Sequence, residues 1–274
     1  MSAASAPEGG PGAAAGAAGE PGRLQLIALP GLPMVRPGDD LADLILQAVE
    51  RAGERLHDGD VLVVAQKIVS KSEGRTVAID TVEPSPRAVE LGQETGRDAR
   101  IVELILSESE EVLRSSYDVI VVVHRLGFVM ANAGIDQSNV QQGDGAGVAL
   151  LLPRDPDASS AALRGELRRR TGADVGIVIN DSHGRPFRTG TVGVALGVAG
   201  LPGLLDLRGR PDLFDRTLRS TEIGLADEIA SAASLLMGQA DEGRPVILVR
   251  GVPQARREGS ARELIRPRSR DLFR

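Results

Sequence analysis

Apolar and polar residues follow two different periods along the chain, and these periods predict strands and helices that alternate. Almost continuous apolar runs of strand length, typical of strands covered on both faces, occur at residues 24–29, 61–66, 117–124, 128–133, 148–152, 174–180 and 246–250. Apolar residues at helical spacing predict helices over residues 39–56, 87–94, 101–113, 159–170 and 222–237. This order predicts a mixed α/β or α+β fold, in which mixed sheets are flanked by helices.

The segments between these elements are expected to be irregular. Three prolines lie within residues 30–37 and restrict their neighbours to extended conformations. Residues 67–75 are polar and predict a loop, whereas the glycine-rich residues 191–203 predict irregular sheet or bulges.

Composition separates a tail from a domain. Residues 1–22 consist mostly of Ala, Gly and Pro without apolar periodicity, so they cannot bury enough surface to offset the entropy of ordering. We expect a disordered tail over residues 1–22 and one ligand-binding domain over residues 23–274. The longest nearly apolar stretch, residues 192–205, is interrupted by glycines and Pro202, so no membrane helix is expected.

Charge and residue usage narrow the class of partner. The chain carries 32 basic and 38 acidic residues, a formal net charge of -6, and only five aromatic residues, which disfavours binding to long nucleic acids. The absence of cysteine excludes disulfides and thiolate metal sites and fits a reducing compartment, so we expect a cytoplasmic protein. Small anionic ligands remain compatible with local basic clusters.

Two segments combine carboxylates with other oxygen groups. In ANAGIDQSN, a predicted strand runs into a glycine turn that carries Asp136 and Asn139. In INDSHGRPFR, the predicted end of a buried strand is followed by Asp181, Ser182, Arg185 and Arg188. Carboxylates and a hydroxyl suit a hard divalent cation, and arginines suit phosphate or carboxylate. The alternatives are an Asx-rich turn and a capped loop with two solvated arginines.

A third segment, QKIVSKSEGR, holds both lysines of the chain. Lys67 and Lys71 lie beside two hydroxyls and a glycine, which suits a trap for phosphate charge with Lys71 as the point charge. The spacing of a Walker A loop is absent, so this signal is weak by itself.

Five segments resemble one known family when they are read in order. GLPMVRPGDDL, DGDVLVVAQKIVSKSEGR, ANAGIDQSN, INDSHGRPFRTG and MGQADEGRPVILVRG occur in the order and spacing of the coenzyme F-420 glutamate ligases. The resemblance runs over residues 24–273 and is to the single-domain γ-glutamyl ligases. It implies GTP-dependent addition of L-glutamate to the glutamate-free coenzyme, a deazaflavin precursor, through an acyl phosphate. It also implies γ-linked addition of further glutamate and an intertwined homodimer.

The resemblance also implies roles for particular residues. The matching metal ligands, for two Mg²⁺ or Mn²⁺ ions with K⁺ as an additional ion, are Asp136, Asp181, Ser182 and Gln239. The matching GTP contacts are Leu32, Pro33, Met34, Val35, Gln66, Lys71, Asn139, Met237, Gly238, Gln239, Ala240, Asp241, Glu242, Gly243 and Arg244. Gln66 stands where family members have Ser, and Phe187 stands where Trp is common.

The predicted catalytic residues are Lys71, on the phosphates, and Arg185 and Arg188. The two arginines are assigned from charge alone to orient the substrate's phosphodiester or carboxylates. Paired aspartates at strand ends would also serve a metal-dependent phosphohydrolase. A nucleotide-binding module without turnover is the alternative from another class.

Overall fold

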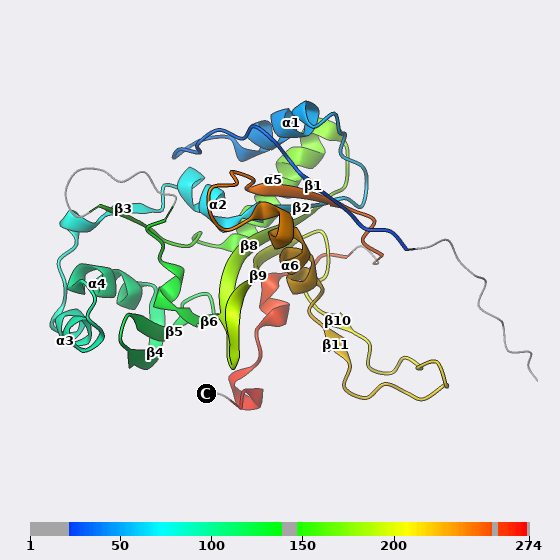
Figure 1. Cartoon of the computed structure of the whole chain (residues 1–274). Coiled ribbons are helices and arrows are strands. Elements are labelled where there is room, and N and C mark those ends of the chain that lie inside the picture. Colours follow the sequence, from blue (N-terminus) through cyan, green and yellow to red (C-terminus); the bar gives the residue numbers. More distant parts are fainter. Residues whose placement is uncertain (1–21, 139–146, 254–256, 273–274) are drawn as a thin grey trace, which may run out of the picture.

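A five-stranded mixed sheet forms the centre of the computed structural model, which describes residues 22–138, 147–253 and 257–272. Its strand order is β1-β12-β2-β8-β9, and only the β2–β8 pair is parallel (Figure 1). The strands are β1 (Gln25–Ala28), β12 (Val246–Arg250), β2 (Val61–Ala65), β8 (Gly176–Arg185) and β9 (Arg188–Ala199).

Helices cover both faces of this sheet, which explains why its strands read as continuous apolar runs. Leu62 and Val64 of β2 pack in one core with α1 (Leu41–Arg51) and α5 (Pro156–Thr171). Val61 and Val63 point the other way and pack against α6 (Leu225–Met237). Full burial of each such side chain stabilises the fold by roughly 1.5–3 kcal/mol. None of the helices in the described ranges has the length and apolar composition needed to cross a bilayer.

A second lobe packs around its own apolar core. Its three-stranded antiparallel sheet joins β4 (Ser109–Ser116), β5 (Val119–His124) and β6 (Val129–Ala131) beside α3 (Pro86–Thr95) and α4 (Ala99–Ser107). Beside it, β3 (Thr76–Ala78) pairs with β7 (Val148–Leu150). The 3₁₀ turns η1 (Ile79–Thr81) and η2 (Asn132–Gly134) follow β3 and β6.

An arm projects from the sheet between β9 and α6. Its base is the hairpin of β10 (Leu205–Asp206) and β11 (Glu222–Ile223) (Figure 1). Leu213 and Phe214 lie in the turn at its tip, which the Asp212–Arg216 backbone hydrogen bond closes, and both are exposed. The C-terminal segment continues from β12 through two 3₁₀ turns, η3 (Ala261–Leu264) and η4 (Arg268–Arg270).

The predicted mixed α and β class is confirmed, but two local predictions about helices were wrong. The expected polar loop at residues 67–75 is largely a helix, α2 (Gln66–Ser72), whose inner side buries Ile68 and Val69 against the core. The helix expected to reach Leu113 ends at Ser107, because residues 109–116 pair with β5 as a strand. Residues 191–199, part of the glycine-rich segment expected to hold irregular sheet or bulges, belong to β9, which has such a bulge opposite Ile179 and Asn180.

The strand expected to end at Asn180 was also placed too short. β8 continues to Arg185, because its polar second half pairs with β9 in a hairpin that runs beyond the apolar sheet. The predicted tail, apart from Gly22, lies outside the described residues.

Candidate functional site

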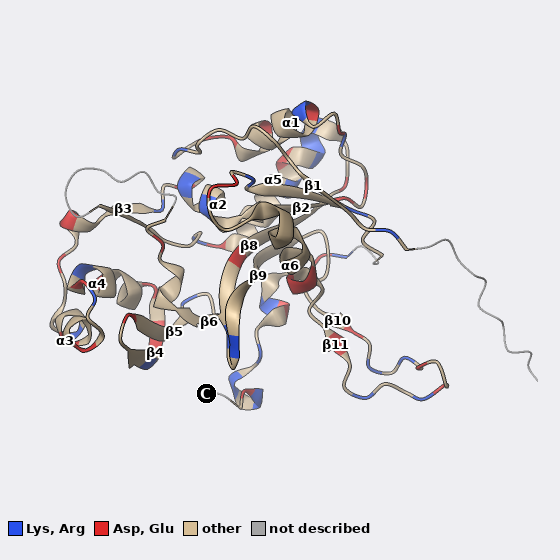
Figure 2. Cartoon of the chain, viewed as in Figure 1, with Lys and Arg blue, Asp and Glu red and all other residues tan. Residues whose placement is uncertain are grey.

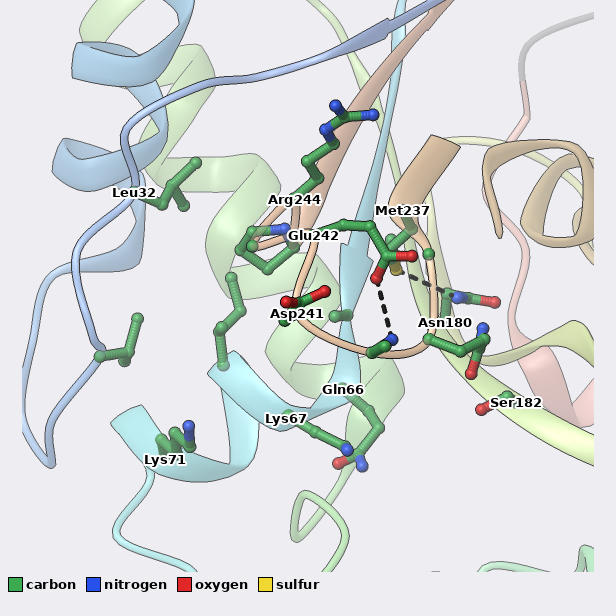
Figure 3. Close-up of a pocket in the computed structure, with 18 of the residues that line it drawn as sticks. Leu32, Gln66, Lys67, Lys71, Asn180, Ser182, Met237, Asp241, Glu242 and Arg244 are labelled. Atoms are coloured by element: carbon green, nitrogen blue, oxygen red, sulfur yellow. Dashed lines mark hydrogen bonds between the residues drawn. The ribbon is translucent and has the colours of Figure 1, made fainter. Parts of the chain in front are cut away.

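A pocket of about 390 Å³ opens at the carboxyl end of β2, where ligand sites of α/β sheets gather. Four segments that are distant in sequence form it: the extended segment after β1, the first turn of α2, the middle of β8, and the loop between α6 and β12 (Figure 3). The predicted site residues that line it are Leu32, Pro33, Met34, Val35, Gln66, Lys71, Asp181, Ser182, Met237, Gly238, Gln239, Ala240, Asp241, Glu242, Gly243 and Arg244. The volume lies within the roughly 300–1,000 Å³ range of ligand pockets.

Helix α2 brings both lysines to the pocket. Lys67 and Lys71 lie four residues apart and therefore share one side of the helix. Burial, together with the neighbouring charge of Lys67, lowers the pKa of Lys71 from its usual value. A bound anion would stabilise the charged form of Lys71, which burial and the charge of Lys67 disfavour. This wall of the pocket therefore suits phosphate groups.

Asp136 does not line the pocket, but it forms an ion pair with Lys67, which does. The Lys67 Nζ lies 2.7 Å from Asp136 Oδ2 and donates to Ser138 Oγ at 2.8 Å. Burial by itself would raise the pKa of Asp136, but hydrogen bonds from Lys67 and the Ser138 backbone outweigh it and hold the pKa below its usual value. The carboxylate is therefore charged and faces a cation.

Backbone geometry holds Asp136 in this position. Asn132, Ala133 and Gly134 all have positive φ, a turn that costs energy at non-glycine residues. The Asn132 side chain stabilises it by accepting a hydrogen bond from the Ile120 backbone N–H at 2.9 Å. Asp136 then exchanges two backbone hydrogen bonds with Leu150, at 3.0 and 2.8 Å. The second lobe thus presents the carboxylate to the central sheet.

Strand β8 supplies Asp181 and Ser182 from within the strand rather than beyond its end. Side chains alternate along a strand, so Asp181 and His183 share a face, and Asp181 Oδ2 lies 3.3 Å from His183 Nε2. Figure 2 shows acidic colour along β8 and basic colour at the far end of the β8–β9 hairpin, where β8 ends at Arg185 and β9 begins at Arg188. Arg185 and Arg188 do not line the pocket, and their role in orienting the substrate's phosphodiester or carboxylates stays a prediction.

The loop after α6 forms one wall of the pocket, and hydrogen bonds within the loop hold its shape. Gly238 has φ 76° and ψ −179°, a conformation essentially restricted to glycine, and a Cβ there would lie 2.1 Å from the Glu242 carboxyl carbon. The Glu242 carboxylate accepts a hydrogen bond from the Ala240 backbone N–H at 2.8 Å, as Figure 3 shows. Backbone hydrogen bonds lower the pKa of Glu242.

Several pocket residues were absent from the predicted set: Ala65, Lys67, Ile68, Asn180 and Pro245. Lys67 could have been included from sequence, since it is one of only two lysines. Asn180 carried a weaker signal, a polar residue at the end of an apolar run. It is buried, and its Nδ2 lies 3.3 Å from Ser234 Oγ. The predicted GTP contact Asn139 lies outside the described residues.

The predicted metal ligands offer only oxygen atoms. Asp136, Asp181, Ser182 and Gln239 would provide two carboxylates, a hydroxyl and an amide oxygen, which suit a hard divalent cation. In the described part of the chain, no group of three or more His, Cys, Asp or Glu is arranged to hold a metal ion. So few protein ligands suit a Mg²⁺ ion that is also coordinated by substrate phosphate oxygens and water. They do not suit an ion that is coordinated by protein atoms alone.

Comparison with known proteins places this arrangement in context. Residues 31–251 match the family described as F420-0:Gamma-glutamyl ligase. A Coenzyme F420:L-glutamate ligase of Methanothermobacter thermautotrophicus is 48% identical, over 92% of this chain and 99% of the relative. The protein of the same name from Methanopyrus kandleri is 48% identical over 92% of this chain and all of the relative, and that of Haloarcula marismortui is 39% identical.

Proposed function

The chain belongs to the F420-0:γ-glutamyl ligase family, and on that premise we propose that it joins L-glutamate to the glutamate-free form of coenzyme F420 in a GTP-dependent reaction. The observation that carries the proposal is the pocket itself. It gathers the segments that the resemblance assigned to GTP, from the residues after β1 to the loop after α6. We further propose that a γ-linked glutamate follows the first.

The chemistry requires activation of a carboxylate. A carboxylate oxygen is a poor leaving group, so the coenzyme's carboxylate first attacks the γ-phosphorus of GTP, forming an acyl phosphate and releasing GDP. The α-amine of glutamate then attacks the acyl carbon, inorganic phosphate leaves, and the amine loses a proton to form the amide. In the second round, the γ-carboxylate of the added glutamate is activated in the same way.

The chain's own residues would hold these anions together. Lys71 faces the phosphates as a partly desolvated cation, and Lys67 keeps Asp136 charged and in place. Asp136, Asp181, Ser182 and Gln239 would hold Mg²⁺ or Mn²⁺, which supplies electrostatic stabilisation of the transferring phosphoryl group. The loop closed by Gly238 and Glu242 would limit the access of water to the acyl phosphate. K⁺ is proposed as an additional ion.

The proposed homodimer is supported by the arm. Leu213 and Phe214 are 97% and 81% exposed at its tip, where a second copy of the chain could cover them. Replacing both with Ser should convert a dimer to a monomer in light scattering, whereas Tyr117→Ser, at another exposed aromatic residue, should leave the dimer intact. A monomeric wild-type protein would contradict the dimer but not the reaction.

Mass spectrometry of the product tests the reaction. Purified protein with GTP, L-glutamate, Mg²⁺ or Mn²⁺ and the glutamate-free coenzyme should yield a product heavier by one or more glutamyl residues, with one GDP and one phosphate per residue added. GTP consumption that proceeds equally without glutamate and coenzyme would instead indicate a phosphohydrolase. Binding of GTP without phosphate release would indicate a nucleotide-binding module.

A further inference from the structure

A second pocket of about 210 Å³ lies beside the first, between the two lobes and the C-terminal segment. Its walls come from β8, β9, the first turn of α6, the turn before β6, and the residues after η3. Four of its lining residues are ionisable: His183, Asp227, Arg266 and Asp271. The rest of the wall is largely apolar, including Phe128 and Val194. None of the roles proposed above uses this pocket.

The two pockets meet at the Asp181–His183 pair. Asp181 lines the first pocket, His183 lines the second, and their side chains lie 3.3 Å apart on one face of β8. Only these two side chains would separate a molecule in the second pocket from a ligand in the first pocket. A reactive group of that molecule, if it lies next to the pair, could reach an activated carboxylate held in the first pocket.

Asp227 gives the second pocket a half-buried acidic wall. Its Oδ1 accepts the Ala195 backbone N–H at 2.8 Å, beside the bulge of β9. Burial raises the pKa of Asp227, although the Ala195 hydrogen bond and the charge of His183 act against the rise. A partly desolvated carboxylate gains more from a cationic ligand than an exposed one does.

The C-terminal segment contributes a positive charge to the second pocket. Arg266 is exposed and lines the pocket with a guanidinium that can bind a carboxylate in bidentate fashion. A pocket with the half-buried carboxylate of Asp227 on one wall, and Arg266 beside Asp271 on another, is complementary to the ammonium group and one carboxylate of a small zwitterion. Its volume of about 210 Å³ is just over half that of the first pocket, so it suits an amino acid rather than a nucleotide.

We propose that this second pocket binds L-glutamate, with Asp227 accepting from the α-ammonium group and Arg266 donating to a carboxylate. The assignment rests on the proposed ligase function and names the site of its amino-acid substrate. It places the amine near His183 and Asp181, at the boundary with the nucleotide pocket.

Steady-state kinetics of two charge-neutral variants test the assignment. Asp227→Asn and Arg266→Gln should each raise the KM for L-glutamate about tenfold or more, the loss expected for one charge-assisted hydrogen bond, while the KM for GTP stays within about twofold. Asp227→Asn retains a side-chain oxygen for the Ala195 N–H. Glu228→Gln and Arg268→Gln remove the same charges from neighbouring exposed positions outside the pocket and should change neither KM.

Glutarate, which lacks the α-amine, separates the two contacts. Inhibition by glutarate should weaken in Arg266→Gln and remain unchanged in Asp227→Asn. An unchanged KM for L-glutamate in Arg266→Gln, whose exposed side chain is not needed for folding, would overturn the assignment. Calorimetric titration of L-glutamate in the presence of a non-hydrolysable GTP analogue reports binding without turnover. A protein that binds glutamate through Arg266 but never ligates it would contradict the proposed function and not this site.

Discussion

The ammonium of Lys67 lies 2.7 Å from the carboxylate of Asp136, and this ion pair ties α2 of the central sheet to the second lobe. Both side chains are about a quarter exposed, so the pair is partly shielded from solvent. The pair joins a residue that lines the proposed nucleotide pocket to a predicted metal ligand, and so connects the two lobes through the candidate site.

A double-mutant cycle should measure this link. Lys67→Met, Asp136→Asn and the double variant, unfolded in urea without metal or nucleotide, should show a coupling energy of about 0.5–2 kcal/mol. The matched control is the Arg87–Glu90 pair of α3, which is more than half exposed and should couple by less than about 0.5 kcal/mol. Equal coupling in the two cycles would show that the Lys67–Asp136 pair is no more than a surface contact.

Removal of either predicted metal-binding carboxylate should stop catalysis and preserve the fold. Asp136→Ala and Asp181→Ala should lower the rate of glutamate addition by roughly 100-fold or more, because phosphoryl charge would lose several kcal/mol of stabilisation. Circular dichroism should remain native. Near-normal rates in both variants would show that the metal assignment is wrong.

Substitution of Lys71 should lower the affinity for GTP. Lys71→Ala removes a cation whose lowered pKa reflects burial and the nearby charge of Lys67, and it should weaken GTP binding by about tenfold, the loss of roughly one charge-assisted contact. Titration calorimetry measures this, and Mn²⁺ affinity should be retained. Lys71→Arg tests whether a compact ammonium is needed. An unchanged GTP affinity in Lys71→Ala would remove Lys71 from the phosphate site.

Glycine at position 238 should be required for the pocket but not for folding. Gly238→Ala places a Cβ 2.1 Å from the Glu242 carboxyl carbon at φ 76°, so the loop must move, and GTP affinity should fall by about tenfold, the effect of roughly 1.4 kcal/mol of strain. The control is Gly165→Ala inside α5, where nothing lies within 4 Å of the new Cβ. This variant should stabilise the protein by about 0.5–1 kcal/mol. Tight GTP binding by Gly238→Ala would show that this loop does not contact the nucleotide.

Acid should destabilise the second lobe through Glu108. Burial by itself would raise the pKa of Glu108, but His124, Arg75 and Arg125 outweigh it and lower the pKa from 4.5 to about 2. The folded state therefore binds fewer protons, and this contribution is fully present above pH 4.5 and is lost as the pH falls toward 2. Its size is about 3 kcal/mol.

Urea unfolding at pH 7, 5 and 3.5 checks this prediction. The free energy of unfolding should fall below pH 4.5, and Glu108→Gln should remove most of this pH dependence while lowering stability at neutral pH. Glu110→Gln, at an exposed neighbouring position, should leave the acid slope unchanged. An unaltered slope in Glu108→Gln would assign the acid sensitivity to other carboxylates.

Prediction of secondary structure from local sequence was wrong where tertiary packing outweighs local preference. Residues 66–72 contain enough polar side chains to resemble a loop, yet Ile68 and Val69 bury one side of a helix against the core. Residues 109–113 continued a helical pattern, but pairing with β5 outweighed their helix propensity. Arg185 and Arg188 were predicted from charge alone to orient the substrate. The β8–β9 hairpin places them outside the lining of the first pocket, and that role stays a prediction.

The mixed class of the fold, its buried central strands, the family resemblance and most residues that line the first pocket could be predicted from the amino-acid sequence. These follow from local periodicity and from motifs, which are short-range properties of the chain. The three-dimensional fold was needed to show that Lys67 pairs with Asp136, that Asp181 and His183 lie between two pockets, and that Asp227 and Arg266 line the second. Those relationships join residues far apart along the chain, and their distances depend on how the helices and the two lobes pack.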